Sequence, residues 1–409
     1  MKYGRIVGWG KYVPPQVLTN FDLEKMVDTT DEWIVTRTGI HRRHIAREGE
    51  TTATMSTAAS RAALIQAGLT PEDLDLIILA TTSPDFLVPP SSSLVQDMLG
   101  AKCGAFQLVA GCTGFVYALA TAQAFISTGL HKNVLVVGAE TISRNVDWQD
   151  RETCVLFGDG AGAVVVQACD EPTGVLSFVL GSDGSGGPSL GVNIGAHAPI
   201  TQAAIARGDH YLHMNGREVF KFATRVMGQV ALEAISQAGM SLSDIDLLIP
   251  HQANLRIIEL AARHLGLPMD KVFVNIQEYG NTSAVSIPIA LVEAIEQGRC
   301  KDGDALCLVG FGAGLTWAAA VVRWGISERP FAMSSLFAPV KRVTERAQVT
   351  LRLAQTMAAM RVLSARHALG KRTAKAVKAA KSKASAALLP LYTRLDKRYT
   401  RDKQKPGGS

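Results

Sequence analysis

A thirteen-residue segment occurs twice in this chain and constrains its fold more than any other feature of the sequence. QAGLTPEDLDLII begins at Gln66 and QAGMSLSDIDLLI begins at Gln237, and seven of the thirteen positions are identical. Each copy follows an apolar pattern of helical period, at 54–65 and 222–235. Each copy also runs into a short apolar stretch that is typical of a buried strand. Helix, turn and strand therefore recur in the same order, which predicts a duplicated α/β unit.

A second pair of equivalent segments extends the duplication. GCT at 111–113 corresponds to GNT at 280–282, and each opens an apolar helical stretch followed by a continuous apolar run. Strands that are apolar throughout are covered on both faces. We therefore expect two similar halves, at 1–170 and 171–325, packed about a pseudo-twofold axis. Cys112 and Asn281 are equivalent points of these halves and should meet near the axis.

Cys112 has two interpretations. A cysteine in an apolar segment is often a small buried hydrophobic residue. A cysteine at the start of a helix, however, lies near unpaired N–H groups and the positive end of the helix dipole, which stabilise a thiolate. In this second interpretation Gly111 allows a sharp turn into the helix, and Gly114 allows a substrate carbonyl to approach the backbone.

Two further polar residues complete a candidate catalytic set. His251 in PHQAN follows the second predicted strand, and the carboxyl ends of parallel strands are where α/β proteins place their chemistry. Alone, it could equally be a hydrogen-bonded core histidine. Asn281 in GNTSA carries an amide that can donate hydrogen bonds. Together with Cys112, these residues predict a nucleophile and two donors that act on one substrate oxygen.

Six motifs spread along the chain resemble those of the β-ketoacyl-acyl-carrier-protein synthase III family, the condensing enzymes that start bacterial fatty acid synthesis. The motifs are DTTDEWIVTRTGI (28–40), AGCTGF (110–115), FGDGAGA (157–163), PHQANLRII (250–258), GNTSA (280–284) and FGAGLTW (311–317). The resemblance covers about residues 2–324. It implies an α/β thiolase-like fold, with duplicated halves in a layered αβαβα arrangement.

The resemblance also implies a two-stage reaction without a cofactor or a metal. Cys112 takes the acyl group of an acyl-CoA primer, while the main-chain N–H groups of Cys112 and Ala313 bind the oxyanion. Malonyl-ACP (malonyl acyl carrier protein) then loses CO2, and His251 and Asn281 stabilise the resulting enolate. The product is a 3-oxoacyl-ACP. The alternative is a specialised acyltransferase or condensing enzyme of secondary metabolism, which uses the same acyl-enzyme with a different acceptor.

Substrate contacts carry over from the same family pattern. Trp33 and Arg37 match the positions that sandwich the adenine of CoA, and Arg151 and Asn254 match further CoA contacts. Phe311 matches the aromatic residue beside the cysteine. A basic set matches positions that face the acidic carrier protein: Lys221, Arg256 and Arg263. His264 stands where relatives often have a second basic residue, so this patch is weaker than usual.

The loop at 85–91 matches the region that closes the acyl pocket across the interface of a homodimer. Val88 stands where some acetyl-specific relatives carry a larger phenylalanine. We therefore expect room for a primer that is longer or more branched than acetyl. Ala313 also differs from the family pattern. It replaces a glycine that is common in relatives, and it requires backbone angles that suit a residue with a Cβ.

Bulk composition excludes several other classes. The chain has 409 residues, of which 47% are hydrophobic, so large cores are possible. It has no apolar run of membrane-spanning length and no secretory signal pattern, so we expect a cytoplasmic protein. Six cysteines without CxxC spacing are expected to be reduced thiols. FGDGAGA precedes VVV, which is typical of a strand, so we reject a phosphate-binding loop there. The histidines of HYLH (210–213) have no further ligands beside them in the sequence, so we do not expect a metal site.

The segment 326–409 differs from the rest of the chain. It holds 19 Lys and Arg against 4 Asp and Glu, whereas acidic residues predominate in 1–325. The absence of Gly and Pro from 340–369 favours a helix. Three interpretations stay open: a solvated extension, a basic amphipathic helix peripheral to an anionic membrane, and docking to an acidic partner such as the carrier protein. No nucleic acid is expected, because no reading motif accompanies the charge.

Overall fold

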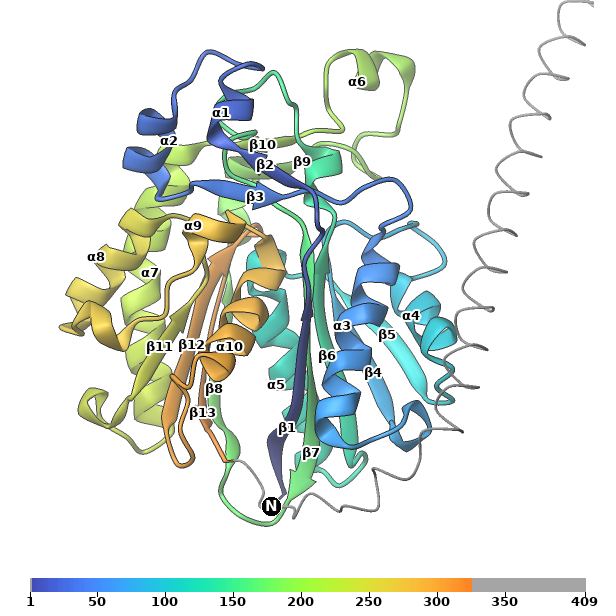
Figure 1. Cartoon of the computed structure of the whole chain (residues 1–409), viewed down its shortest axis with the longest axis vertical. Helices are drawn as coiled ribbons and strands as arrows, with labels where there is room; N and C mark the ends of the chain where they lie inside the picture. Colours follow the sequence, from blue (N-terminus) through green and yellow to red (C-terminus); the bar gives the residue numbers. More distant parts are fainter. Residues whose placement is uncertain (1, 326–409) are drawn as a thin grey trace, which may run out of the picture. The chain divides into compact units, whose positions relative to one another are not determined.

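The computed structural model describes residues 2–325, which contain two mixed sheets and the helices that cover them (Figure 1). The first sheet has the order β1 (Tyr3–Tyr12), β7 (Gly160–Cys169), β6 (Asn133–Glu140), β4 (Leu76–Ala80) and β5 (Gly104–Leu108). The second sheet has the order β11 (Leu247–Pro250), β12 (Ala305–Gly312), β13 (Thr316–Arg323) and β8 (Gly174–Ser182).

Parallel pairing lies at one edge of each sheet. In the first sheet β4 runs parallel to β5 and β6, so that Ile78 aligns with Phe106 on one side and Val136 on the other. In the second sheet β11 runs parallel to β12, and Ile249 aligns with Leu308. The remaining pairs of the two sheets are antiparallel. The repeated order of helix and parallel strand predicted from the sequence is confirmed.

The helices and sheets form five layers, which confirms the predicted αβαβα arrangement. Helices α5 (Gly114–Ser127) and α10 (Ser286–Glu296) lie between the sheets and share one buried core with both of them. The outer face of the first sheet packs against α3 (Thr52–Ala67) and α4 (Ser91–Leu99). The outer face of the second sheet packs against α7 (Gly216–Gln237) and α8 (Leu255–Leu265). Figure 1 shows the central pair between the two outer pairs.

The duplicated segment forms the same capped turn in both halves. The backbone N–H of Thr70 donates to Asp73 Oδ2 at 2.7 Å, and the N–H of Ser241 donates to Asp244 Oδ2 at 2.8 Å. Each turn leads from an outer helix into a strand with a parallel neighbour, β4 or β11. A hydroxyl residue followed three positions later by an aspartate satisfies the donors at the start of a turn. This requirement explains why these positions recur in the sequence.

Shorter elements cover one end of the sheets, at the top of Figure 1. They are β2 (Val17–Thr19), α1 (Asn20–Leu23), α2 (Asp31–Thr38), β3 (Arg42–His44), β9 (Leu190–Val192), α6 (Gln202–Ala206), β10 (Leu212–Met214) and α9 (Ile276–Tyr279). Single 3-10 turns complete the chain: η1 (Pro71–Asp73), η2 (Gly111–Thr113), η3 (Ile142–Asn145), η4 (Gly184–Ser189), η5 (Leu242–Asp244), η6 (Met269–Lys271) and η7 (Ser283–Val285).

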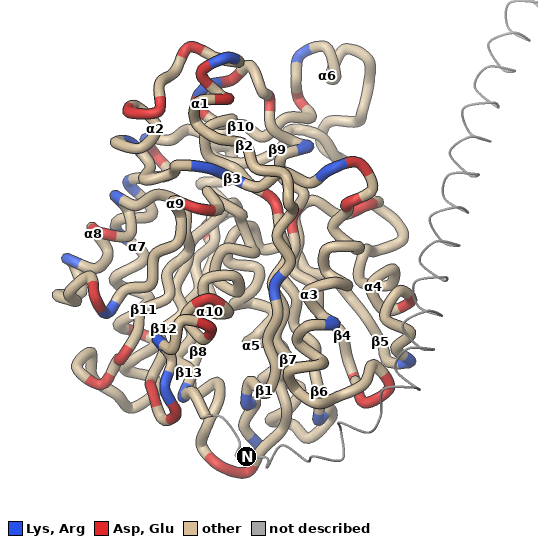
Figure 2. The backbone as a smooth tube through the Cα atoms, in the orientation of Figure 1, with Lys and Arg blue, Asp and Glu red and all other residues tan. Residues whose placement is uncertain are grey.

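Charged residues lie mainly on loops and outer helices, and β4, β5 and β12 carry none (Figure 2). Strand β7 begins at Gly160 within the FGDGAGA run, which confirms the strand predicted there. All six cysteines are unpaired. No helix within residues 2–325 is long and apolar enough to cross a bilayer. The predictions for 326–409, including the helix at 340–369, lie outside the described residues.

Candidate active site

Cys112 lies in the 3-10 turn η2, which runs directly into α5. Gly111 has a φ of 54°, and a Cβ at this residue would lie 2.7 Å from the backbone nitrogen of Ala313. Only glycine fits this left-handed, crowded position without strain. The Thr113 hydroxyl donates to the Ala110 carbonyl at 2.6 Å and fixes the turn. The predicted sharp entry into the helix is therefore confirmed.

Gly114 has a different role from the predicted one. A Cβ at Gly114 would lie 3.0 Å from the Cβ of Ala80 and 3.5 Å from the Cβ of Ala284. The residue therefore allows α5 to pack closely against β4 and η7, and it does not line the cavity beside Cys112. The prediction that it gives a substrate carbonyl access to the backbone is wrong. The same packing brings η2 against η7, so the equivalent points of the two halves meet as predicted.

His251 follows β11 and is fully buried, and its backbone N–H donates to Val309 O at 2.8 Å. Its Nδ1 lies 2.6 Å from Ser286 Oγ, which already accepts the N–H of Gln252 at 3.3 Å. The Ser286 hydroxyl has no other acceptor among the described residues, so we assign its proton to the hydrogen bond with Nδ1, which leaves the ring proton on Nε2. Nε2 is buried and has no partner among the described residues. His251 is therefore not a core histidine with both ring nitrogens hydrogen-bonded within the described residues.

Burial lowers the pKa of His251 from 6.5 to about 3. The imidazole is therefore neutral at physiological pH, because the charged form is penalised in the dry interior. A neutral ring with its proton on Nε2 is a hydrogen-bond donor toward the cavity.

Asn281 is oriented by its neighbours. Its backbone N–H donates to Leu156 O at 2.8 Å, and its side-chain Oδ1 accepts the N–H of Ser283 at 2.9 Å. With Oδ1 used in this way, the Nδ2 group is directed away from the backbone of Ser283 and is available as a donor. This orientation is the one that the predicted role of Asn281 as the second donor requires.

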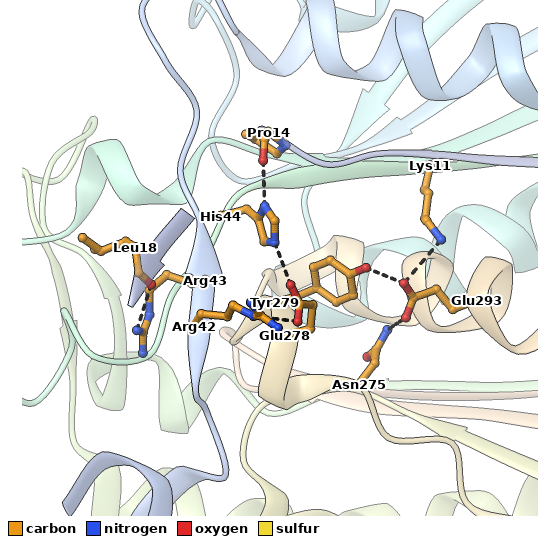
Figure 3. A network of polar contacts seen from close by, with 10 residues as sticks. All are labelled: Lys11, Pro14, Leu18, Arg42, Arg43, His44, Asn275, Glu278, Tyr279 and Glu293. Carbon is orange, nitrogen blue, oxygen red and sulfur yellow. Dashed lines mark hydrogen bonds and ion pairs between the residues drawn. The ribbon is translucent and has the colours of Figure 1, made fainter. Parts of the chain in front are cut away.

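A polar network holds the segment that precedes Asn281 (Figure 3). Glu293 on α10 accepts the Tyr279 hydroxyl, the Asn275 side-chain amide at 2.9 Å and the Lys11 ammonium at 3.3 Å. Glu278 accepts Arg42 Nε at 2.7 Å. The network ties α9 to β1, β3 and α10, so the backbone that carries Asn281 is fixed from both sides.

One cavity of about 550 Å3 brings the predicted catalytic residues together. Cys112, His251 and Asn281 all line it, with Phe311 and Ala313 beside them. Ala313 does not have a positive φ, so its Cβ causes no backbone strain. The ring of Phe311 meets His251 edge-on at 5.4 Å. Cys307 lies buried in β12 and does not line this cavity.

Burial raises the pKa of the Cys112 thiol to about 11. The Ser283 hydroxyl and the N–H groups of Ala313 and Cys112 hydrogen-bond to the sulfur and lower the pKa, whereas the charge of Glu140 raises it. The predicted stabilisation of the thiolate at the helix start is therefore outweighed by burial. The two N–H groups that approach the sulfur are those predicted to bind an oxyanion.

The predicted CoA contacts lie at the mouth of the cavity. Trp33, Arg37 and Asn254 line the cavity, and Arg151 lines the adjoining groove together with Trp33 and Arg37. The guanidinium over the Trp33 ring is that of Arg151, at 5.0 Å from the centroid. Tertiary structure brings these two residues together from distant parts of the chain. Arg37 lines the same cavity and groove as Trp33, and the sandwich of adenine between Trp33 and Arg37 stays a prediction.

The predicted carrier-protein residues lie on two adjacent outer helices (Figure 2). Lys221 is exposed on α7, and Arg256 and Arg263 are exposed on α8. Arg256 extends over the Phe220 ring at 5.7 Å, which joins the two helices at their surface. Two further arginines of α7 are exposed and were not predicted: Arg217 and Arg225. They lie four residues before and after Lys221, and this spacing in the sequence would have placed all three on one face of a helix.

Val88 does not line the cavity of its own chain and is 85% exposed. Phe86 and Leu87 beside it are also exposed. Within one chain, therefore, the residue has no contact with the acyl site. Its predicted role depends on a second copy.

Sequence reasoning missed three polar residues of the site: Glu140, Ser283 and Ser286. Ser283 and Ser286 lie within or just after GNTSA, but serine in a small-residue run gives little signal. Glu140 ends an apolar strand, where a lone acidic residue resembles an ordinary strand terminus. No group of three or more His, Cys, Asp or Glu side chains within residues 2–325 is arranged to hold a metal ion.

Comparisons with known proteins agree with this geometry. Residues 106–184 match the family described as 3-oxoacyl-[acyl-carrier-protein (ACP)] synthase III, and residues 235–324 match its C-terminal part. The chain is 53% identical over 321 residues to a beta-ketoacyl-[acyl-carrier-protein] synthase III of Desulfitobacterium hafniense, covering 78% of this chain and 97% of that protein.

Solved structures give the same result. The crystal structure of 3-oxoacyl-[acyl-carrier-protein] synthase III from Aquifex aeolicus matches with a TM-score of 0.74 and 50% identity, covering 78% of this chain and all of that one. The priming beta-ketosynthase of the R1128 polyketide pathway matches with a TM-score of 0.74 at 36% identity, covering 79% and 97%.

Proposed function

Because the chain belongs to the β-ketoacyl-acyl-carrier-protein synthase III family, we propose that it condenses an acyl-CoA primer with malonyl-ACP and so initiates fatty acid synthesis. It is an acyltransferase-class condensing enzyme. The observation that carries the proposal is the meeting of Cys112, His251 and Asn281 in one cavity. The secondary-metabolism alternative is not favoured, because the relatives above 50% identity are synthase III proteins.

In the first stage Cys112 takes the acyl group. Its sulfur bonds to the thioester carbon, the bond to the CoA sulfur breaks, and the thiol proton of Cys112 leaves with CoA as its thiol. The N–H groups of Cys112 and Ala313, which point at the sulfur, stabilise the oxyanion that forms beside it. Trp33, Arg37, Arg151 and Asn254 hold the CoA at the mouth of the cavity.

In the second stage malonyl-ACP loses CO2, and the electron pair of the broken C–C bond forms an enolate. His251 Nε2–H and the amide of Asn281 donate to the enolate oxygen. The enolate carbon attacks the acyl group on Cys112, whose sulfur leaves. Because decarboxylation supplies the carbanion, no base is needed to remove a carbon-bound proton, and two donors are sufficient.

Mass spectrometry of the protein tests this assignment directly. Incubation with acyl-CoA should add one acyl group to Cys112, and malonyl-ACP should then discharge it as 3-oxoacyl-ACP. Cys112→Ala should abolish the adduct, whereas Cys307→Ala, at a buried cysteine outside the cavity, should retain it. An unlabelled wild-type protein, or an adduct that persists in Cys112→Ala, contradicts the proposal.

The primer is expected to be longer or more branched than acetyl. The argument is the small side chain of Val88, which in a homodimer would close the acyl pocket of the partner. Acylation rates with acetyl-, isobutyryl- and hexanoyl-CoA test this expectation. A strict preference for acetyl-CoA contradicts it.

The other partners and the location are part of the same proposal. Lys221, Arg256 and Arg263 form an exposed basic surface for the acidic carrier protein. We propose a cytoplasmic homodimer.

Peripheral membrane binding through 326–409 stays a prediction. Flotation with anionic vesicles, compared between the full chain and a protein ending at Gly325, tests it; equal flotation of the two contradicts it.

A further inference from the structure

Glu140 is a buried carboxylate that the proposed reaction does not use. It ends β6 and has no exposed surface. Its two oxygens accept the Thr82 N–H at 3.1 Å, the Thr82 hydroxyl at 2.9 Å, the Ser83 N–H at 3.1 Å and the Ser83 hydroxyl. The Thr81 and Ser283 hydroxyls complete the set at 3.3 Å and 3.2 Å. These donors stabilise the ionised form of Glu140 and lower its pKa, whereas burial acts in the opposite direction and raises it.

Ser283 is the one donor of this set that comes from the other half of the molecule. It has a φ of 53°, and it is the only non-glycine residue of positive φ within residues 2–325. Backbone strain of this kind persists where surrounding contacts enforce it, and it concentrates at functional sites. Two hydrogen bonds enforce it here, from the Ser283 N–H to Asn281 Oδ1 and from its hydroxyl to Glu140.

The strained serine reaches the reactive sulfur. Ser283 lines the same cavity as Cys112, and η7, which begins at Ser283, packs against η2, which holds Cys112. The Ser283 hydroxyl is the hydrogen-bonding group that lowers the pKa of the thiol. A serine hydroxyl has one proton to donate. When Cys112 is a thiol, the hydroxyl can accept from the sulfur and donate to Glu140. When the sulfur carries negative charge, the hydroxyl can turn to donate to it, while Glu140 keeps its donors from Thr81, Thr82 and Ser83.

We infer that Ser283 and Glu140 are positioning residues for the Cys112 sulfur. Glu140 accepts the Ser283 hydroxyl while Cys112 is a thiol, and Ser283 becomes the donor that stabilises the sulfur when it carries negative charge. The inference rests on the proposed role of Cys112 as the acylated nucleophile. It explains why a carboxylate and a strained serine lie together at the junction of the two halves.

Their electrical effects on Cys112 have opposite signs. The Ser283 hydrogen bond lowers the pKa of the thiol, whereas the negative charge of Glu140 raises it. The other titratable residues that line this cavity are His251, which burial keeps neutral, and Arg37 and Glu152, which also line the adjoining groove. Because the two effects on Cys112 differ in sign, opposite shifts in the Ser283 and Glu140 variants are a result that a loss of folding alone would not produce.

The test is the pH dependence of alkylation of Cys112 by iodoacetamide between pH 7 and 11, followed on the Cys112 peptide by mass spectrometry. At pH 9, Ser283→Ala should react about 3- to 10-fold more slowly than wild type, and Glu140→Gln about 3- to 10-fold faster, for shifts of half to one pH unit. Thr81→Val removes one donor from Glu140 without touching Cys112 and should change the rate less than about twofold.

Three outcomes overturn the inference: unchanged profiles in both variants, shifts in the same direction, or a Thr81→Val effect as large as that of Ser283→Ala. If Glu140→Gln does not fold, Ser283→Ala decides alone, since slower alkylation supports the inference and an unchanged profile overturns it. Acylation of wild type by acyl-CoA is measured in parallel. If no adduct forms, the proposed function fails, whatever the alkylation profiles are.

Discussion

At the scale of single residues, Ser286 decides which ring nitrogen of His251 carries the proton. Its hydroxyl donates to Nδ1 and leaves Nε2–H as the donor toward the cavity. Ser286→Ala should therefore slow decarboxylation of malonyl-ACP about 10-fold or more, because the imidazole can adopt the wrong tautomer. Acylation of Cys112 should be unchanged. Release of CO2 and the acyl adduct are measured separately.

The matched control is Ser60→Ala, which removes a buried serine hydroxyl bonded within α3, far from His251 in the fold. It should affect neither step. Equal losses in acylation and decarboxylation in Ser286→Ala would indicate a general disturbance of the cavity and would contradict the proposed role of Ser286.

His251 also makes stability depend on pH. Its pKa is lowered from 6.5 to about 3 in the folded state, so between these values the unfolded chain binds more protons. Its contribution is therefore complete above about pH 6.5 and is lost as the pH falls toward 3. Wild type should lose about 2 kcal/mol more than His251→Asn between pH 7.5 and 5.0. Urea unfolding at both pH values measures this difference.

The comparison with His251→Asn is needed because other buried groups titrate in the opposite sense. Burial raises the pKa of Glu140 and of Asp159 in the folded state. Their contribution to the stability of the folded protein therefore becomes more favourable as the pH falls. Both proteins share them, so their contribution cancels in the difference. Parallel pH curves for wild type and His251→Asn would show that His251 is not held neutral.

At the scale of secondary-structure elements, the anchor of α9 carries a prediction. Glu293→Ala would leave the Tyr279 hydroxyl and the Asn275 amide without their shared acceptor and should lower the free energy of unfolding by about 2 to 4 kcal/mol. Because α9 leads into Asn281, decarboxylation should also slow, while acylation is retained. Urea unfolding and the two partial reactions provide the measurements.

Glu296→Ala is the control for that change, since Glu296 lies one turn further along the chain, is half exposed and has Lys11 as its ion-pair partner within residues 2–325. It should cost less than about 1 kcal/mol. A loss as large as that of Glu293→Ala would mean that the charge of Lys11, and not the anchoring of α9, carries the effect.

The elements themselves were largely predictable, because apolar periodicity and a repeated turn depend on local sequence. Strands β4 and β11 and the helix after Cys112 were predicted in this way, whereas β5, the strand directly before Cys112, was not. Local sequence could not predict which residues surround each catalytic or binding side chain in the folded protein. The pKa of Cys112 depends on burial between two halves, and the ring of Trp33 meets Arg151 only after folding.

At the scale of the whole molecule, we propose that the boundary between the halves lies at 170 and 171, in the connection between β7 and β8. These two strands belong to different sheets. The five-stranded sheet ends at β5, which pairs on one side only within residues 2–325. Ser91 N–H donates to Gln107 Oε1 at 2.7 Å, so the loop at 85–91 lies beside this edge.

An exposed edge strand flanked by an apolar loop favours pairing with a second copy, because each edge offers unpaired backbone groups and apolar surface to the other. Leu87 is 86% exposed in that loop, and Val109, at the end of β5, is 70% exposed yet lines the cavity. Leu87→Asp should therefore convert a dimer to a monomer at micromolar concentration and impair acylation by opening the cavity at Val109. Leu130→Asp, at a residue that is 65% exposed after α5, should do neither. Light scattering that finds wild type monomeric, or Leu87→Asp still dimeric, contradicts this interface.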